Sequence, residues 1–469
     1  MQSVGDGWGW VQEEFGQLRV PDARLGVRFR LMASRTIERG GGRISDVFED
    51  AAERQGAYDL VEGGRVPGAA LTASMAAACV ERSRGAPWVF VPIDGSSIQV
   101  VDRRKKTDLG LVGTYTNNGR GMQVVTALAL SAQGTPLGIC AQTWWVRSPK
   151  RRKRGPSTYR PIEERESRHV VQTIRDVQQR YAQTDCVPWM VIDRGGDATV
   201  ILDELVRGGG RFTVRASWNR RLAGGPPPTY LRESLAKERV RLFYDVDVPA
   251  GHKRLARRAR MAVSVASVEL NFRHDWQARR SNLTVNVVWT REVNPPRGQK
   301  PLDWMLYTNA PVTILDDLRL VVRSYTMRWR IEDFHKTWKS GHCRVEEMQL
   351  RSAAAVQLWA TLLAAVAARI ERLRHLARTE SESPATVELT KVEIEALKIL
   401  KERQKKRTEV VGPGIPTIGQ AVRWIADLGG YTGKSSGGPP GAITIGRGFE
   451  YLRPAVALLK QLRATGKLR

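Results

Sequence analysis

The stretch WVFVPIDGSSIQVVD, residues 88–102, is apolar at its start and rich in β-branched and aromatic residues. Two runs of the same texture follow, GMQVVTALALSAQG (residues 121–134) and TPLGICAQTWWVRS (residues 135–148). Such runs, bounded by glycine, asparagine and proline, predict the strands of an antiparallel meander. Asp94 ends the apolar part of the first run, and an acidic residue at the end of a buried strand is seldom there for packing.

Helices and strands alternate after the meander. Residues 163–181 have a helical period, and CVPWMVIDRGG (residues 186–196) predicts a buried strand that ends at Asp193. A helix over 198–208 and the strand RFTVRAS complete the mixed α/β order of the RNase H fold. The ends of the first and fourth strands lie side by side in that fold. We therefore expect Asp94 and Asp193 to be neighbours.

A strongly basic, β-leaning insertion, residues 217–300, interrupts this predicted core. It contains the alternating segment NLTVNVVWT, which is typical of a half-buried strand. The segment DWMLYTNAP then returns the chain to the core. YTMRWRIEDFHKTWK, residues 325–339, follows as a predicted helix.

Four polar or charged residues share one side of this predicted helix, because their offsets of three, seven and fourteen nearly complete whole turns. Burying charges costs more than burying leucine, so such a stripe favours a site over a purely structural helix. The four residues are Tyr325, Arg328, Glu332 and Lys339.

Glu332 completes a set of three carboxylates with the two aspartates. Asp94 or Asp193 alone could be an ordinary turn or cap residue. Together the three suit two divalent cations about 4 Å apart, which activate an attacking oxygen and stabilise the leaving oxygen of a phosphodiester. Hard oxygen ligands favour Mg²⁺ or Mn²⁺.

The composition points to a polyanionic partner. The 469 residues include 75 Lys and Arg against 48 Asp and Glu, which gives a formal charge of +27. Nucleic acid is the first candidate and a membrane surface the second. The apolar run over residues 353–370 contains Gln357 and Arg369, which indicates a core helix, so we expect a soluble, intracellular protein. Its four cysteines form no CxxC pair and predict ordinary thiols in a reducing compartment.

Both ends of the chain have helical patterns. Between residues 10 and 80, Arg24 and Arg28 lie on one face of an amphipathic helix and Leu25 and Phe29 on another, so the arginines are either DNA contacts or a solvated surface. We expect a helical domain over 1–80, which the resemblance described below implies is DNA-end-binding, a catalytic core over 81–350 and a helical C-terminal domain over 351–469. Such a late helical domain often pairs protomers.

The pattern Y-x2-R-x3-E-x6-K formed by Tyr325, Arg328, Glu332 and Lys339 resembles the signature of the insertion-sequence-four family of bacterial DDE transposases. RWRIEDFHKTWKSG is most similar to its transposon-five-type members. PID at Asp94, DRGGD over 193–197 and WMLYTNAPV also match family motifs, so the resemblance spans nearly the whole chain.

The resemblance implies a role for each matched residue. The carboxylates of Asp94, Asp193 and Glu332 would hold two Mg²⁺ ions, for which Mn²⁺ could substitute. Tyr325, Arg328 and Lys339 would bind phosphates next to the cut, and Trp304 would stack on a base flipped out of the transposon end. Arg215 would lie near the same DNA end. Arg24 and Arg28 match an N-terminal D-x-R-R-x-x-R pattern, in which Leu25 replaces the second arginine.

The implied activity is cut-and-paste transposition by nicking, hairpin formation, hairpin opening and strand transfer. The implied partners are transposon-end DNA, target DNA and a second copy of the chain in a homodimer, in the nucleoid-associated cytoplasm of a bacterium and without a membrane. Two alternatives stay open. One is a catalytically silent DNA-binding derivative, and the other is a metal-dependent nuclease of the RNase H fold.

Overall fold

The computed structural model describes residues 9–101, 108–113, 119–148, 160–224, 227–251, 254–274, 279–404, 410–433 and 438–467. The chain divides into two compact units. Unit 1 consists of Met1–Arg84, Gly95–Arg151 and Arg330–Arg469, and unit 2 consists of Gly85–Asp94 and Arg152–Trp329.

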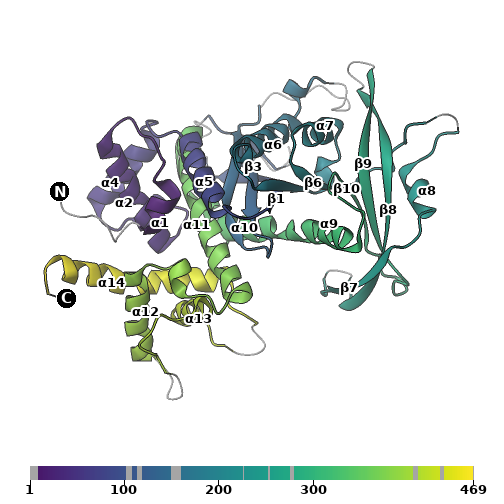
Figure 1. The fold of residues 1–469 in the computed structure, drawn as a ribbon. Helices are drawn as coiled ribbons and strands as arrows, with labels where there is room; N and C mark the ends of the chain where they lie inside the picture. Colours follow the sequence, from purple (N-terminus) through teal and green to yellow (C-terminus); the bar gives the residue numbers. More distant parts are fainter. Residues whose placement is uncertain are drawn as a thin grey trace. The chain divides into compact units, whose positions relative to one another are not determined.

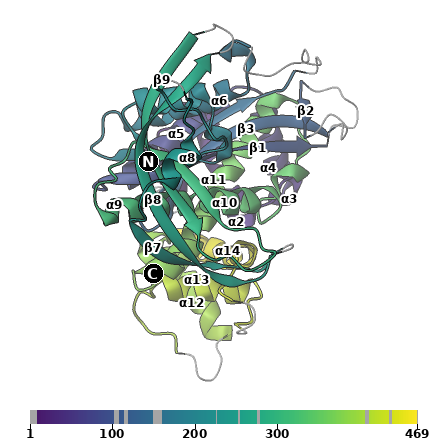
Figure 2. The same ribbon diagram turned by 90° about the vertical axis from the view of Figure 1, so that its right-hand side faces the viewer.

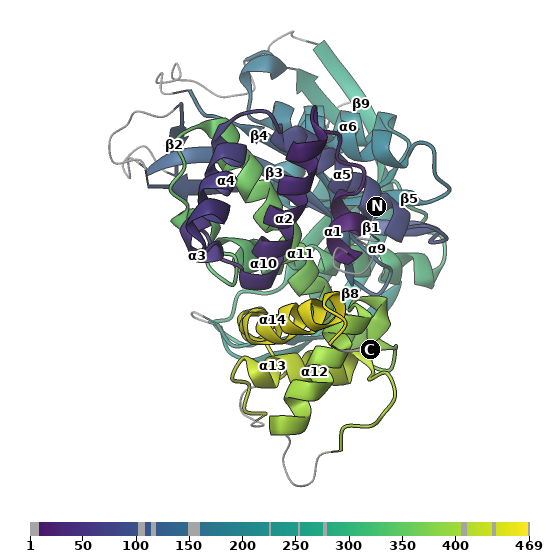
Figure 3. The ribbon, with the colours of Figure 1, turned by 90° about the vertical axis from the view of Figure 1, so that its left-hand side faces the viewer.

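The N-terminal part of unit 1 is helical, as predicted (Figure 3). Its longest helix, α2, begins after Asp22, whose carboxylate accepts a hydrogen bond from the backbone N–H of Arg24 at 2.8 Å. Leu25, Phe29 and Met32 are buried along one face of α2, which confirms the amphipathic pattern. The helices are α1 (Gly9–Phe15), α2 (Ala23–Arg39), α3 (Ile44–Val47), α4 (Ala51–Glu62) and α5 (Gly68–Arg82).

Unit 1 also contains β2 (Gly110–Val112), β3 (Gly119–Leu130), β4 (Pro136–Trp145) and the second half of β1 (Trp88–Val100). The order is β2-β3-β1, and β4 pairs antiparallel with β3, so the predicted meander is confirmed. Helix α11 (Ala353–Thr379) packs on α5 and β4. It is long and apolar enough to cross a membrane, but 83% of its most apolar window is buried inside the structure, as expected of a core helix.

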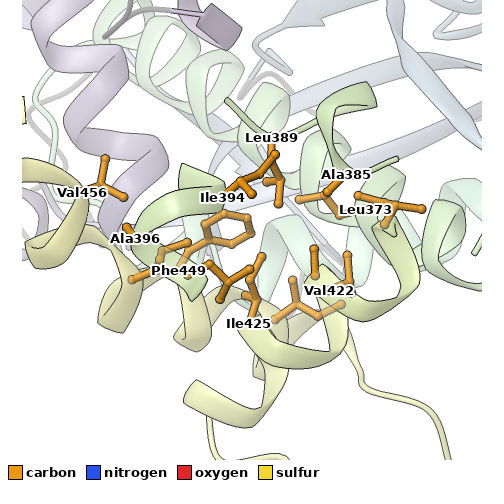
Figure 4. Close-up of a cluster of buried hydrophobic side chains, with 14 of the residues drawn as sticks. Leu373, Ala385, Leu389, Ile394, Ala396, Val422, Ile425, Phe449 and Val456 are labelled. Atoms are coloured by element: carbon orange, nitrogen blue, oxygen red, sulfur yellow. The ribbon is translucent and has the colours of Figure 1, made fainter. Parts of the chain in front are cut away.

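The C-terminal helices of unit 1 share a hydrophobic core. Ile394, Val422, Ile425 and Phe449 come from three different helices and meet there, together with Leu373 of α11 (Figure 4). The helices that form this core with α11 are α12 (Lys391–Gln404), α13 (Ile418–Leu428) and α14 (Ala442–Ala464). Helix α10 (Trp329–Lys339, in unit 1 from Arg330) precedes α11 in the chain.

Unit 2 is built on a mixed sheet with the strand order β1-β5-β6-β10-β9-β8-β7 (Figure 1). Strands β1, β5 and β6 are parallel; α6 leads into β5 after the meander, and α7 connects β5 to β6. The first elements are α6 (Ser167–Tyr181), β5 (Val187–Ile192), α7 (Thr199–Arg207) and β6 (Arg211–Arg215). This is the mixed α/β arrangement that the strand and helix order predicts for an RNase H-like core.

The basic insertion forms three antiparallel strands, and the long pair β8 and β9 forms most of it (Figure 2). Strand β10 then pairs antiparallel with both β9 and β6, which returns the chain to the core as predicted. The elements are α8 (Leu231–Ala236), β7 (Leu242–Val248), β8 (Arg257–His274), β9 (Arg279–Glu292), β10 (Asp303–Thr308) and α9 (Leu315–Met327).

Candidate active site

The two predicted aspartates come directly after the paired stretch of two neighbouring parallel strands. Strands β1 and β5 pair along six residues, and Ile93 is in register with Ile192. Asp94 and Asp193 are the next residues on the two strands, and both are partly exposed. The predicted adjacency of the first and fourth strands is therefore confirmed.

Strand β1 does not end at Asp94, as the sequence pattern predicted, but continues to Val100. The pairing with β5 ends at Ile93, whereas β3 is the other neighbour of β1 in the sheet. At Gly121 of β3, an added side chain would collide with the carbonyl oxygen of Ile98. Because β3 still provides a partner, the strand extends beyond the residue at which β5 turns away.

Asp193 caps the short 3-10 helix η3 (Arg194–Gly196) that follows β5. Its Oδ1 accepts a hydrogen bond from the backbone N–H of Gly195 at 2.7 Å. This bond fixes the carboxylate at the start of the turn, since one of its oxygens is tied to the backbone. The DRGGD segment is thus a strand end followed by a capped turn.

Asp197, the last residue of that segment, joins the turn to the loop after β6. Its Oδ2 accepts hydrogen bonds from the backbone N–H groups of Ser217, at 2.6 Å, and Trp218, at 3.1 Å. Arg220 lies 2.6 Å from its Oδ1, and the aspartate side chain is fully buried. A buried charge is stable only when it is paired and hydrogen-bonded, and Asp197 meets both conditions.

Tyr325 is the centre of a ring cluster within unit 2. The Trp304 ring lies 5.7 Å from the Tyr325 ring, centroid to centroid. The guanidinium carbons of Arg215 and Arg328 each lie 6.0 Å from the Tyr325 ring. Three residues that the resemblance assigned to DNA binding therefore gather around the ring of a fourth, Tyr325, which is 4% exposed. Trp304 is only partly buried at the start of β10, and not a core tryptophan.

The sequence predicted one helix from Tyr325 to Lys339, but the structure has two. Helix α9 ends at Met327 and α10 begins at Trp329, with Arg328 as the turn between them. The N–H of Arg328 bonds to the carbonyl oxygen of Tyr325 three residues back, at 3.2 Å, instead of four. The guanidinium of Arg328 also lies 5.1 Å from the Trp329 ring, so its side chain contacts an aromatic ring on either side of the break.

Glu332 and Lys339 both lie on α10, seven residues apart, and therefore on one face of it. Glu332 is partly exposed. The opposite side of the helix is fixed by Trp338, which stacks on Phe334 and donates a hydrogen bond from Nε1 to the carbonyl oxygen of Ala360 at 3.0 Å. Buried aromatic packing of this kind holds the Glu332 face in a defined orientation.

Lys339 reaches across to the second half of β1. Its Nζ donates a hydrogen bond to the carbonyl oxygen of Ser97 at 2.8 Å and lies 3.3 Å from Oε1 of Glu346. The same glutamate oxygen accepts the backbone N–H of Gln99 at 3.2 Å. The end of α10 is thus bound to the strand that carries Asp94 three residues before Ser97.

One group of potential metal ligands occurs among the described residues, formed by Asp333, Glu371 and His375. Their ligand atoms lie within 4.8 Å of one another. Arg374 already pairs with Asp333 at 2.6 Å and with Glu371 at 2.7 Å. Burial and then the charges of Arg330, Arg374 and a further arginine lower the pKa of His375 to about 3. The group therefore forms an arginine-centred ion cluster.

The predicted N-terminal contacts are displayed on the surface of unit 1. Arg24 and Arg28 are exposed on the first turns of α2. Arg35, further along, lies 2.9 Å from Glu53 and is only half-exposed. The first two arginines therefore remain accessible to a DNA backbone, whereas Arg35 stabilises the packing of α2 on α4.

Sequence reasoning gave no role to Asp197 or Glu346. Asp197 was visible as the end of DRGGD, but its contacts come from residues twenty or more positions later. Glu346 has no neighbouring motif, and its partners are Lys339 and a strand far away in sequence. Only tertiary structure could have identified either residue.

Two family models match the chain, and both describe transposases. The model described as Transposase DDE domain matches residues 162–368, and the model described as Transposase DNA-binding matches residues 8–66. The first match includes Asp193 and Glu332, and the second includes Arg24 and Arg28. The chain thus carries a DDE transposase domain and a transposase DNA-binding domain, which support a DNA transposase with DNA as its partner. Domains of the DDE class generally use divalent metals.

Proposed function

We propose that this protein catalyses the cut-and-paste transposition of an insertion sequence. The observation that carries the proposal is the parallel pairing of β1 with β5, after which Asp94 and Asp193 follow on adjacent strands. The match to a DDE transposase domain supports the same reading. All the steps proposed, which are nicking, hairpin formation, hairpin opening and strand transfer, are phosphoryl transfers on DNA.

Asp94, Asp193 and Glu332 are the proposed ligands of two Mg²⁺ ions, for which Mn²⁺ would substitute. Two carboxylates on adjacent strands repel each other, and a bound cation relieves that repulsion. Their oxygen atoms suit hard divalent ions. When bound, such ions would activate the attacking oxygen and stabilise the leaving 3′ oxygen of the DNA strand.

The cluster around Tyr325 would hold the DNA backbone beside the cut. Arg215 and Arg328 supply two cations at the same ring, and a guanidinium binds a phosphate through two parallel hydrogen bonds. Lys339 would add a third positive charge. Trp304, partly exposed beside Tyr325, would stack on a base flipped out of the transposon end.

The N-terminal helices would recognise the transposon end, with Arg24 and Arg28 as phosphate or base contacts. A formal charge of +27 supports binding to a polyanion, which should weaken steeply as salt is added. We further propose that two copies of the chain form a homodimer that bridges two ends before joining them to target DNA. The helical C-terminal region over 351–469 is the proposed dimerisation surface, and the bacterial nucleoid is the proposed location.

The test uses the purified protein, Mg²⁺ and an end-labelled duplex of the terminal inverted repeat taken from the DNA that flanks the gene. We expect a nicked product, then a hairpin, then an opened end that joins to a target plasmid. Asp193→Asn should abolish all of these products while it leaves DNA binding in place. Cleavage by this variant at the wild-type rate would contradict the assignment of the carboxylates.

Two outcomes would identify the alternative functions. Nicking without a hairpin, together with no strand transfer from a pre-cleaved end, would identify a metal-dependent nuclease. Sequence-specific binding without any cleavage would identify a catalytically silent derivative. Either result would contradict the proposal.

A further inference from the structure

The loop after β6 is fixed to the turn that carries Asp193. The buried carboxylate of Asp197 accepts the backbone N–H groups of Ser217 and Trp218, as described above. The hydroxyl of Ser217 donates a second hydrogen bond to the carbonyl oxygen of Arg194 at 2.8 Å. Arg194 directly follows Asp193, so the loop is attached to the residue next to a proposed metal ligand.

Trp218 projects from this fixed backbone with 66% of its surface exposed. Trp189, by contrast, is buried and donates a hydrogen bond to Thr213 at 2.9 Å, whereas Trp329 is also exposed, at 57%. An isolated exposed apolar residue is common on protein surfaces and needs no explanation by itself. Here, however, an ion pair and three hydrogen bonds fix the loop that carries the exposed ring, so the ring is presented from a rigid base.

The surroundings of Trp218 favour a nucleic acid partner. Arg215 lies three residues before it, at the end of β6, and belongs to the cluster around Tyr325. Arg220, two residues after it, neutralises Asp197, so the turn carries no uncompensated acidic group from that residue. An exposed indole on a fixed turn, three residues along the chain from Arg215, suits a base with a π-face on a negatively charged backbone.

We propose that Trp218 is an aromatic platform that stacks on an unpaired base of the DNA at the cleavage site. The inference rests on the proposed transposase function and adds a residue to it. Stacking on a fixed indole would position the DNA strand relative to the turn at Asp193. Trp218 is thus a positioning residue and takes no part in the chemistry.

The test compares two terminal-repeat duplexes. One is fully paired, and the other has two unpaired nucleotides at the cleavage site, one of them 2-aminopurine. Binding is measured in Ca²⁺, in place of Mg²⁺, to slow cleavage. Trp218→Ala should weaken binding of the unpaired duplex by about 5- to 150-fold and remove the fluorescence quenching that stacking produces. The affinity for the fully paired duplex should change by less than about twofold. Trp218→Phe, which retains an aromatic ring, should keep most of the quenching.

Phe243→Ala is the matched control, because Phe243 is a half-exposed aromatic residue on β7 of the same unit. It should bind both duplexes as the wild type does. Unchanged quenching in Trp218→Ala, or an equal loss of affinity for both duplexes, would overturn the stacking role. If the wild type cleaves the end while quenching is independent of Trp218, only this inference fails. If the wild type neither binds nor cleaves the terminal repeat, the proposed function fails with it.

Discussion

Glu346 and Lys339 are ion-paired, with the carboxylate Oε1 3.3 Å from the ammonium nitrogen. The same lysine is the proposed phosphate contact of α10, so the glutamate and a DNA phosphate compete for one cation. We predict that Glu346→Gln tightens binding of the terminal-repeat duplex by about two- to fivefold, the range that a partly exposed ion pair provides. Fluorescence anisotropy at fixed salt measures the change.

The neighbouring Glu347 provides the control for this prediction. It carries the same charge but pairs with Arg344, at 3.7 Å, and not with Lys339. Glu347→Gln should therefore change the affinity by less than Glu346→Gln does. In a Lys339→Met background the advantage of Glu346→Gln should disappear, and its persistence would show that the effect is only a loss of negative charge.

A second prediction concerns the ring cluster. Tyr325→Ala removes the ring that Trp304, Arg215 and Arg328 contact, and truncation of a buried aromatic residue costs about 3 to 5 kcal/mol of stability. Tyr325→Phe keeps the ring, so its free energy of unfolding should lie within about 1 kcal/mol of the wild-type value. If the hydroxyl binds a phosphate, the phenylalanine variant should still bind the transposon end more weakly, as a filter-binding assay would show. Equal affinity of Tyr325→Phe and the wild type would show that the Tyr325 hydroxyl does not bind the DNA.

The strand framework could be predicted from the sequence because its signals are local. Apolar β-rich runs bounded by turn residues predicted β1, β3, β4 and β5, and the order of strands and helices predicted that β1 and β5 pair. The position of Asp193 at the end of β5 could be predicted as well, because the glycines of DRGGD indicate a turn directly after the strand. The continuation of β1 beyond Asp94 was not predictable, because it depends on hydrogen bonding to β3.

The helix break at Arg328 was also not predictable, because no local sequence signal marks it. No proline or glycine occurs in YTMRWRIEDFHKTWK, and each residue there tolerates a helix. The interruption coincides with contacts of the Arg328 side chain with Tyr325 and Trp329. Likewise, the sequence placed Lys339 on a DNA-binding face but could not show that Ser97 and Glu346 hold it in the DNA-free protein.

A third prediction tests the buried ion pair of Asp197 and Arg220. Asp197→Asn leaves a largely buried guanidinium without its counter-charge, which typically costs about 3 to 5 kcal/mol. Asp203→Asn breaks a surface pair with Arg207, in which the arginine is 77% exposed, and should cost at most about 1 kcal/mol. Thermal unfolding of both variants gives the comparison. Similar stability losses in the two variants would contradict the prediction, because the buried pair of Asp197 would then stabilise the protein no more than the exposed pair of Asp203.

The last prediction is a pH dependence of stability that arises at His342. Burial, and then the charge of Arg344, lower the pKa of His342 from 6.5 to about 4. The ring lies against the backbones of Gly40 and Gly446, and Glu450 is 3.9 Å from its Nδ1. The folded state therefore takes up its proton at lower pH than the unfolded state. The contribution of neutral His342 to the free energy of unfolding is fully present above about pH 6.5. It falls by up to about 3 kcal/mol as the pH decreases to about 4.

His342→Gln should remove this part of the pH dependence, because glutamine does not titrate. Urea unfolding of the wild type and the variant at several values between pH 7.5 and 4.5 measures it. The difference in free energy of unfolding between the two proteins should narrow as the pH falls, since only the wild type loses the contribution of His342. Parallel curves would contradict the prediction. Gly446→Ala, which would press a methyl group into the His342 ring, should destabilise the protein at every pH, whereas Gly414→Ala, with open space around it, should not.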